Sequence, residues 1–90
     1  MPALKKDIQI VNKLGLHARP AALLVQEASK FKANIELKTD EMKVNGKSIM
    51  GVMMLAAGYG STLTIIADGE DAGEAIEALE TLIKRKFDEE

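Results

Sequence analysis

The chain has 90 residues, of which 47% are hydrophobic, enough for one domain with a modest core, and we expect a single domain over residues 1–90. Twelve basic and fourteen acidic side chains give a net charge of −2, and aromatic residues are only 3%, so nucleic acid is not an expected partner. The chain has no cysteine and one histidine, which argues against thiol chemistry and a metal site, and we expect no cofactor. No apolar run suggests a signal peptide or a membrane span, so we expect a cytoplasmic protein without membrane insertion.

The first predicted elements are a strand and a helix. Residues Ile8–Val11 alternate well enough for a strand whose two isoleucines point inward. From Ala18 onward, apolar residues recur at spacings of three and four, which predicts an amphipathic helix. Pro20 fits only the first turn of a helix, so the helix begins at or beside His17. Its buried face would comprise Ala21, Leu24, Val25, Ala28 and Phe31.

Residues 33–48 show two further alternating patterns, one on each side of the turn-like Thr39–Glu41, and predict two strands. Their apolar residues are Ile35 and Leu37, then Met42 and Val44. The next run, Ile49–Leu55, is too apolar to classify by its period alone. Because Ser48 precedes it and serine is a preferred helix cap, we predict a short helix.

The last third of the chain predicts a strand and a helix. Residues Leu63–Ala67 form the strand, with alternate side chains on one face. The helix has early acids, Asp71 and Glu74, and late basic residues at positions 84–86, which suits the helix dipole. Its apolar positions are Ala72, Ala75, Ile76, Leu79, Leu82 and Ile83.

This order of elements predicts an α+β open-faced sandwich. Four strands would form one mostly antiparallel sheet, covered on one face by three helices in the order βαββαβα.

The single histidine stands at the predicted start of the first helix, where unpaired backbone N–H groups and the helix dipole favour an anion. A phosphoryl group on His17 could accept hydrogen bonds from the amides of Ala18 and Arg19 and lie near the Arg19 guanidinium. Imidazole is also a competent nucleophile near neutral pH. On spacing alone, however, a histidine that caps the helix or lies in solvent is the favoured interpretation.

Two other motifs do not predict chemistry. The stretch NGKS at residues 45–48 resembles the end of a phosphate-binding Walker loop, but Glu41 stands where that pattern requires glycine. The carboxylate pairs Asp40–Glu41 and Glu89–Glu90 fall in a turn and at the chain end, where we expect them to be solvated.

The stretches GLHARPAA (Gly15–Ala22) and KSIMGVMML (Lys47–Leu55) closely resemble the HPr family of histidine-containing phosphocarrier proteins. The resemblance covers essentially the whole chain and implies a phosphoryl carrier rather than an enzyme. It implies that His17 accepts a phosphoryl group on Nδ1 from phospho-enzyme I of the phosphoenolpyruvate-dependent phosphotransferase system and passes it to a IIA domain. Arg19 would steady the phosphate, and Pro20 would shape the helix start.

The resemblance also implies a regulatory serine and a docking surface. Ser48 would be the residue phosphorylated by an HPr kinase/phosphorylase, with a transcriptional regulator as a further partner, although a serine at this position also has a capping role. Enzyme I and IIA domains would dock on Arg19, Leu23, Gln26, Ile49, Met50 and Met53. Each methionine taken alone could equally be a core residue. Nothing in the sequence requires a dimer, so we expect a monomer.

Three alternatives remain open. NKLG before the histidine motif and the acidic end FDEE resemble the nitrogen-related paralogue of the family, whereas KSIMGVM resembles the sugar-transport carriers. A purely regulatory module is a second alternative, although family members confined to regulation have lost the histidine. The third is an unrelated α+β interaction domain, such as a ferredoxin-like ligand-binding module.

Overall fold

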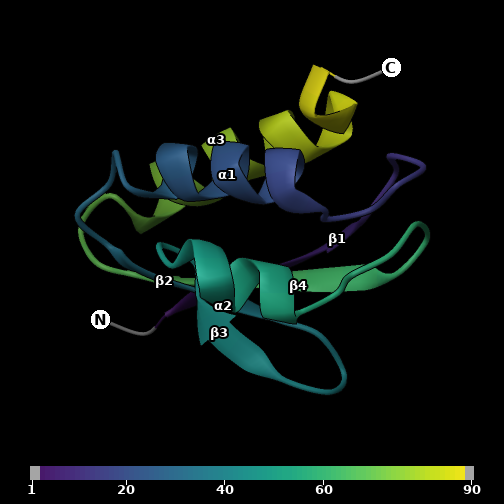
Figure 1. Cartoon of the computed structure of the whole chain (residues 1–90). Coiled ribbons are helices and arrows are strands. Elements are labelled where there is room, and N and C mark those ends of the chain that lie inside the picture. Colours follow the sequence, from purple (N-terminus) through teal and green to yellow (C-terminus); the bar gives the residue numbers. More distant parts are fainter. Residues whose placement is uncertain (1–2, 89–90) are drawn as a thin grey trace.

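A four-stranded antiparallel sheet with helices on one face makes up the computed structural model, which describes residues 3–88 (Figure 1). The strands are β1 (Leu4–Gln9), β2 (Asn34–Lys38), β3 (Lys43–Asn45) and β4 (Thr62–Asp68), and the helices are α1 (Ala18–Ala28), α2 (Ile49–Met54) and α3 (Ala72–Lys84). The strand order is β1-β4-β2-β3, and every neighbouring pair is antiparallel. The expected βαββαβα order is confirmed, followed by a short 3-10 turn, η1 (Lys86–Asp88).

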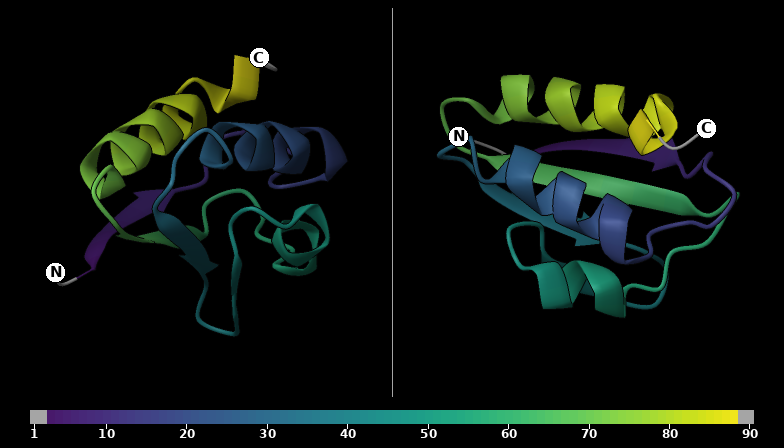
Figure 2. Two further views of the ribbon diagram at one scale, coloured as in Figure 1. Left: turned by 90° about the vertical axis from the view of Figure 1, so that its left-hand side faces the viewer. Right: turned by 45° about the horizontal axis from the view of Figure 1, so that its top comes forward.

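The helices pack in a row across the sheet. Helix α3 contacts β1 and β4, α1 lies beside α3, and α2 lies on the other side of α1, next to β3 (Figure 2). Between the helices and the sheet lies the core, to which β4 contributes Leu63, Ile65 and Ala67 by strict alternation, as predicted. The predicted core residues Val25, Phe31 and Leu82 are only partly buried because they lie at its margin.

The first strand differs from its prediction. It runs over Leu4–Gln9 and not over Ile8–Val11. Its first four residues are all exposed, so the start of the strand shows no alternation of buried and exposed side chains. Antiparallel pairing with β4 holds these residues in the sheet. Ile8 and Ile10 are buried as expected, but Ile10 follows the strand and is held by hydrogen bonds with Ser61 and Gly60.

The structure after Lys84 differs from the sequence-based prediction. Helix α3 stops at Lys84, so the basic residues after it lie outside the helix. Phe87 has a φ of 55° in the turn η1, and its side chain is completely buried in the core.

Asp40 and Glu41 are exposed as expected, whereas Glu89 and Glu90 lie outside the described residues. No helix within residues 3–88 is both long enough and apolar enough to cross a membrane.

Asp71 ties α3 to the loop after α1. It precedes the first residue of α3, but its carboxylate turns away from the helix and accepts hydrogen bonds from the backbone amides of Lys32 (2.8 Å) and Ala33 (2.9 Å). The Lys32 amide is the main cause that lowers the pKa of this carboxyl below its ordinary value.

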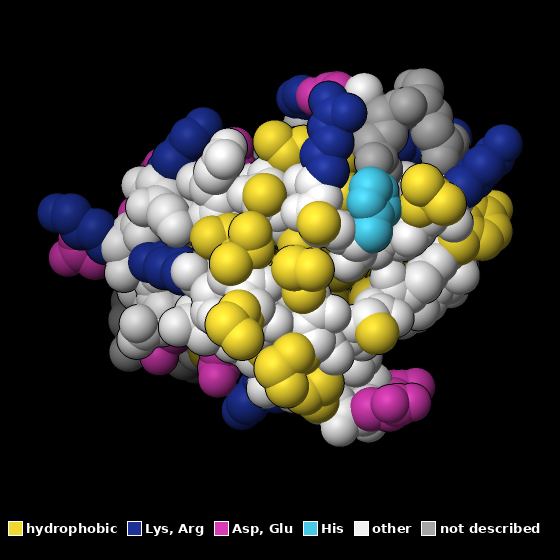
Figure 3. Space-filling view, in the orientation of Figure 1, with side chains coloured by type: hydrophobic (Ala, Val, Ile, Leu, Met, Phe, Trp, Pro, Cys, Tyr) yellow, Lys and Arg dark blue, Asp and Glu magenta, His cyan; other side chains and the backbone are white. Residues whose placement is uncertain are grey.

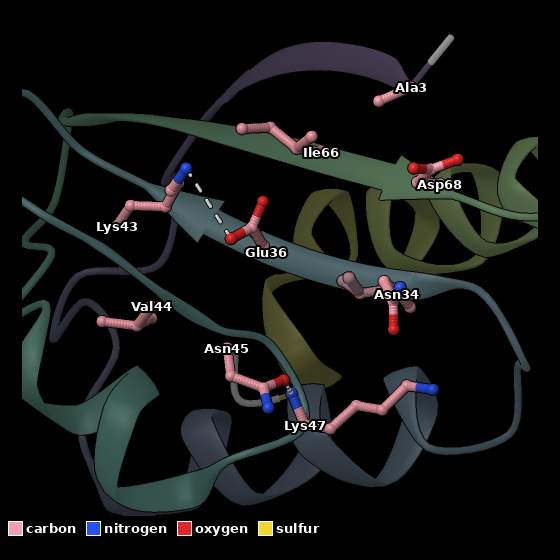
Figure 4. Close-up of a pocket in the computed structure, with 10 residues that line it drawn as sticks. Ala3, Asn34, Glu36, Lys43, Val44, Asn45, Lys47, Ile66 and Asp68 are labelled. Carbon is pink, nitrogen blue, oxygen red and sulfur yellow. Dashed lines mark hydrogen bonds and ion pairs between the residues drawn. The ribbon is translucent and has the colours of Figure 1, made fainter. Parts of the chain in front are cut away.

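The face of the sheet opposite the helices carries a shallow pocket of about 470 Å³ (Figure 4). Polar side chains of β2 and β3 line much of it, including Glu36 and Lys43, which form an ion pair at 3.7 Å. None of the residues predicted to carry function lines this pocket, so the candidate site lies elsewhere.

Candidate functional site

His17 is the N-cap residue of α1, as the sequence predicted. Its backbone is extended (φ −77°, ψ −173°), and its carbonyl oxygen accepts the first helical hydrogen bond, from the Ala21 amide at 3.0 Å. Within the described residues the His17 side chain makes no capping hydrogen bond, so the imidazole does not cap α1. The half-buried ring instead stands at the positive end of α1.

The start of α1 presents two backbone donors beside the imidazole. An α-helix leaves its first amides without helical partners, and of these Pro20 has no N–H. The amides of the exposed residues Ala18 and Arg19 are therefore donors that the helix itself leaves without partners. No acidic residue occupies the first turn, so nothing there opposes a bound anion. Pro20 is buried, so this residue of the first turn lies on the core side of α1.

The loop before His17 is fastened to the segment that follows α2. The amide of Leu16, a buried residue, donates to the Ala57 carbonyl oxygen at 2.8 Å. Gly15 has a φ of 68°, and a Cβ there would lie 2.5 Å from the same oxygen. Asn12, which no sequence pattern singled out, is fully buried and donates from Nδ2 to the Gly15 carbonyl oxygen at 2.7 Å. An amide in a turn is ordinary, so the sequence carried no signal of this burial.

Ser48 caps α2, as predicted. Its hydroxyl oxygen accepts a hydrogen bond from the Gly51 amide at 3.1 Å, and its carbonyl oxygen accepts from the Val52 amide at 2.9 Å. The side chain is half-buried. The residue before it is anchored too, because Lys47 Nζ donates to the carbonyl oxygen of Phe31 at 2.7 Å.

The predicted docking residues lie on two helices in contact, α1 and α2. Ile49, Met50 and Met53 are exposed on α2, Met50 to 73%, which is unusual for large apolar side chains. On α1, Arg19 and Gln26 are exposed and Leu23 is half-buried. Figure 3 shows apolar side chains gathered on the face where the imidazole lies. Further exposed large apolar side chains, not predicted, are Leu4, Leu14, Met54 and Tyr59.

Comparison with known proteins identifies the family of this chain. The family model described as the PTS HPr component phosphorylation site matches residues 4–85. The phosphocarrier protein HPr of Treponema pallidum is 51% identical over 85 residues, which cover 94% of this chain and 97% of that protein. The crystal structure of HPr-C-His from Thermoanaerobacter tengcongensis superposes with a TM-score of 0.92 at 53% identity and covers 97% of this chain and 98% of that one.

HPr-like proteins named Crh are similar as well. Crh of Halalkalibacterium halodurans is 51% identical over 83 residues, 92% of this chain and 99% of that protein. A crystal structure of Crh from Bacillus subtilis, a dimer with a swapped domain, has a TM-score of 0.74 at 46% identity and covers 92% and 95% of the two chains. With a family match over nearly the whole chain and relatives of about 50% identity, this chain belongs to the HPr family of phosphocarrier proteins of the phosphotransferase system.

Proposed function

We propose that this protein carries a phosphoryl group on His17, which it accepts from phospho-enzyme I and passes to a IIA domain. The observation that carries the proposal is the place of the chain's one imidazole, at a helix start whose first amides have no helical partners and whose first turn has no acidic residue. Family membership supports the same assignment.

The transfer needs only groups that this site contains. The lone pair of the imidazole Nδ1 attacks the phosphorus atom, and the bond from phosphorus to the donor breaks, so that its electron pair leaves with the donor. The amides of Ala18 and Arg19 donate hydrogen bonds to the phosphoryl oxygens, and the Arg19 guanidinium adds a positive charge. The onward transfer is the same exchange in reverse, with the IIA domain as acceptor.

The helix start holds the phosphate without trapping it. A charge at an exposed helix terminus gains about 0.3–1 kcal/mol, less than the roughly 1.4 kcal/mol that changes an equilibrium tenfold. A carrier benefits from this modest gain because the group must leave again.

We infer that the partners dock on the apolar patch formed by Leu23, Ile49, Met50 and Met53 with Arg19 and Gln26 at its edge. Flexible methionine side chains suit a surface that receives several different proteins. Ser48 lies directly before this patch, at the N-terminus of α2. Its phosphorylation by an HPr kinase would add charge beside Ile49 and Met50 and so weaken docking.

A purely regulatory role is the second candidate, because Crh proteins are as similar to this chain as the HPr proteins are. The presence of His17 argues against a protein that has only this regulatory role. We propose a cytoplasmic protein whose whole chain acts as one phosphocarrier domain. Because Crh of Bacillus subtilis forms a swapped dimer, the expected monomer is to be tested by measuring the oligomeric state in solution.

Labelling with phosphoenolpyruvate tests the proposal. The protein is incubated with enzyme I and labelled phosphoenolpyruvate, and an acid-labile phosphoryl group is measured before and after a purified IIA domain is added. We expect labelling of the parent, loss of the label to the IIA domain, and no labelling of His17→Ala. A folded His17→Ala variant that still takes label would disprove the assignment, and a parent that takes none would favour the regulatory role.

A further inference from the structure

One peptide unit beside His17 is held at both of its polar ends. The carbonyl oxygen of Gly15 accepts a hydrogen bond from Asn12 Nδ2 at 2.7 Å, and the amide of Leu16 donates to Ala57 O at 2.8 Å. A peptide unit is planar, so two bonds at opposite ends fix its orientation and with it the direction in which the chain enters His17. We call these two bonds the peptide clamp.

Asn12 makes the clamp with a side chain that has no access to solvent. Its exposed fraction is 0%, and it is the one polar residue in the buried set of residues 3–88. Burying an amide costs free energy unless it is hydrogen-bonded, so an apolar residue is the ordinary occupant of such a position. The main chain of Asn12 contacts Gly15 as well, through the Gly15 amide and the Asn12 carbonyl oxygen at 3.1 Å. The turn from Asn12 to Gly15 is thus closed twice.

The other side of the clamp belongs to the segment that follows α2. Gly58 Cα would lie 2.8 Å from a Cβ on Gly15, so the two backbones touch without room for a side chain. The clamp therefore connects the loop before His17 to the segment directly after α2, the helix that carries Ile49, Met50 and Met53. A partner seated on α2 would meet the imidazole at a set distance and angle.

We propose that Asn12 is a positioning residue for phosphoryl transfer, acting through the peptide clamp on the placement of His17 relative to α2. This inference rests on the proposed function. Transfer requires the nucleophile to be in line with the phosphorus atom, and a misplacement of about 1 Å is able to lower a rate about 100-fold. Docking depends on side chains that the clamp does not contain, so Asn12 affects the rate of transfer within the complex more than the affinity.

Asn12→Asp tests this because it keeps the size of the side chain and replaces the donating NH₂ with an oxygen that repels the Gly15 carbonyl. Asn34→Asp, the same change at an exposed position of β2, is the control for added charge. Initial rates of phosphorylation by phospho-enzyme I are measured over a range of concentrations of each variant. We expect kcat to fall at least about tenfold for Asn12→Asp with KM within about twofold of the parent, and Asn34→Asp to match the parent.

The hydrogen-exchange rate of the Leu16 amide tests whether the peptide clamp is intact, independently of phosphoryl transfer. We expect faster exchange in Asn12→Asp than in the parent, and unchanged exchange in Asn34→Asp. Asn12→Leu, which is apolar and of similar size, replaces Asn12→Asp if the latter does not fold, with the same expected results.

The outcomes separate the two proposals. A parent that takes no label refutes the proposed function, whereas a labelled parent with an equally fast, folded Asn12 variant refutes the positioning role. A slow Asn12 variant whose Leu16 amide exchanges as slowly as in the parent also refutes it, because the clamp would then be intact. A rise in KM with unchanged kcat would make Asn12 a determinant of docking and overturn the inference.

Discussion

Replacing Gly15 with alanine tests the close approach on which the placement of His17 depends. At this residue φ is 68°, and the added Cβ would lie 2.5 Å from the Ala57 carbonyl oxygen and 2.8 Å from Gly58 Cα. Both atoms belong to the backbone, so neither can rotate away as a side chain would. The turn before His17 or the segment after α2 must move instead.

The cost has two parts. A residue other than glycine pays about 1–2 kcal/mol for a left-handed backbone conformation. Relief of the contact also stretches or breaks the bond from the Leu16 amide to Ala57 O, and an unsatisfied buried donor costs about 1–3 kcal/mol. Together these give a loss of about 2–5 kcal/mol in the free energy of unfolding, which lowers Tm by roughly 8–40 °C in a domain of this size.

Two matched glycine-to-alanine variants separate these costs in urea and thermal unfolding. Gly60 has a φ of 83° and, in the part of the chain that the structure describes, no atom within 4 Å of an added Cβ, so Gly60→Ala should pay only the backbone cost of about 1–2 kcal/mol. Gly73 lies inside α3, where alanine should stabilise by about 0.5–1 kcal/mol. If Gly15→Ala loses no more stability than Gly60→Ala, the tight contact with Ala57 is absent from the protein in solution.

Three further predictions concern charge and capping. Arg19→Ala should slow phosphoryl transfer yet unfold within about 0.5 kcal/mol of the parent, because Arg19 is exposed; a large loss of stability with an unchanged rate would reverse its role. Ser48→Ala should lose about 1 kcal/mol of stability and bind enzyme I as the parent does. Ser48→Asp should keep its stability, because aspartate also caps a helix, but should bind enzyme I about tenfold more weakly. If a titration shows that Ser48→Asp binds enzyme I as tightly as the parent, Ser48 is only a helix cap. Asp71 has a lowered pKa in the folded state, so its contribution to stability is present well above the ordinary value of 3.8 and is lost as the pH falls through its lower folded-state value. Asp71→Asn should therefore be less stable than the parent in urea at about pH 7, and the difference in stability should shrink as the pH falls below 3.8; a difference independent of pH would contradict this.

The helix starts follow from local chemistry, which is why the sequence alone located them. Pro20 is tolerated only in a first turn, and Ser48 supplies the oxygen that the Gly51 amide needs. The alternation of Leu63 to Ala67 likewise identified a strand with one buried face. The position of His17 at a helix start therefore follows from neighbouring residues alone, and with it the candidate phosphoacceptor.

Features that depend on distant partners do not follow in this way. The exposed first residues of β1 are a strand because β4 offers them hydrogen bonds, and Phe87 is buried because a left-handed turn after α3 returns it to the core. Exposure on α2 was also a matter of packing, since each methionine alone could have been a core residue. The tertiary structure shows that those of α2 face solvent.

The sequence by itself determined the order of elements, the helix start at His17 and the serine cap, since these depend on residues within a few positions of one another. Only the tertiary structure decided that Asn12 is buried, that Gly15 touches the backbone at Ala57, and that the loop before His17 is bonded to the segment after α2. Some 40 residues separate the two sides of that contact, and backbone groups form most of it, so no pattern of side chains along the chain records it.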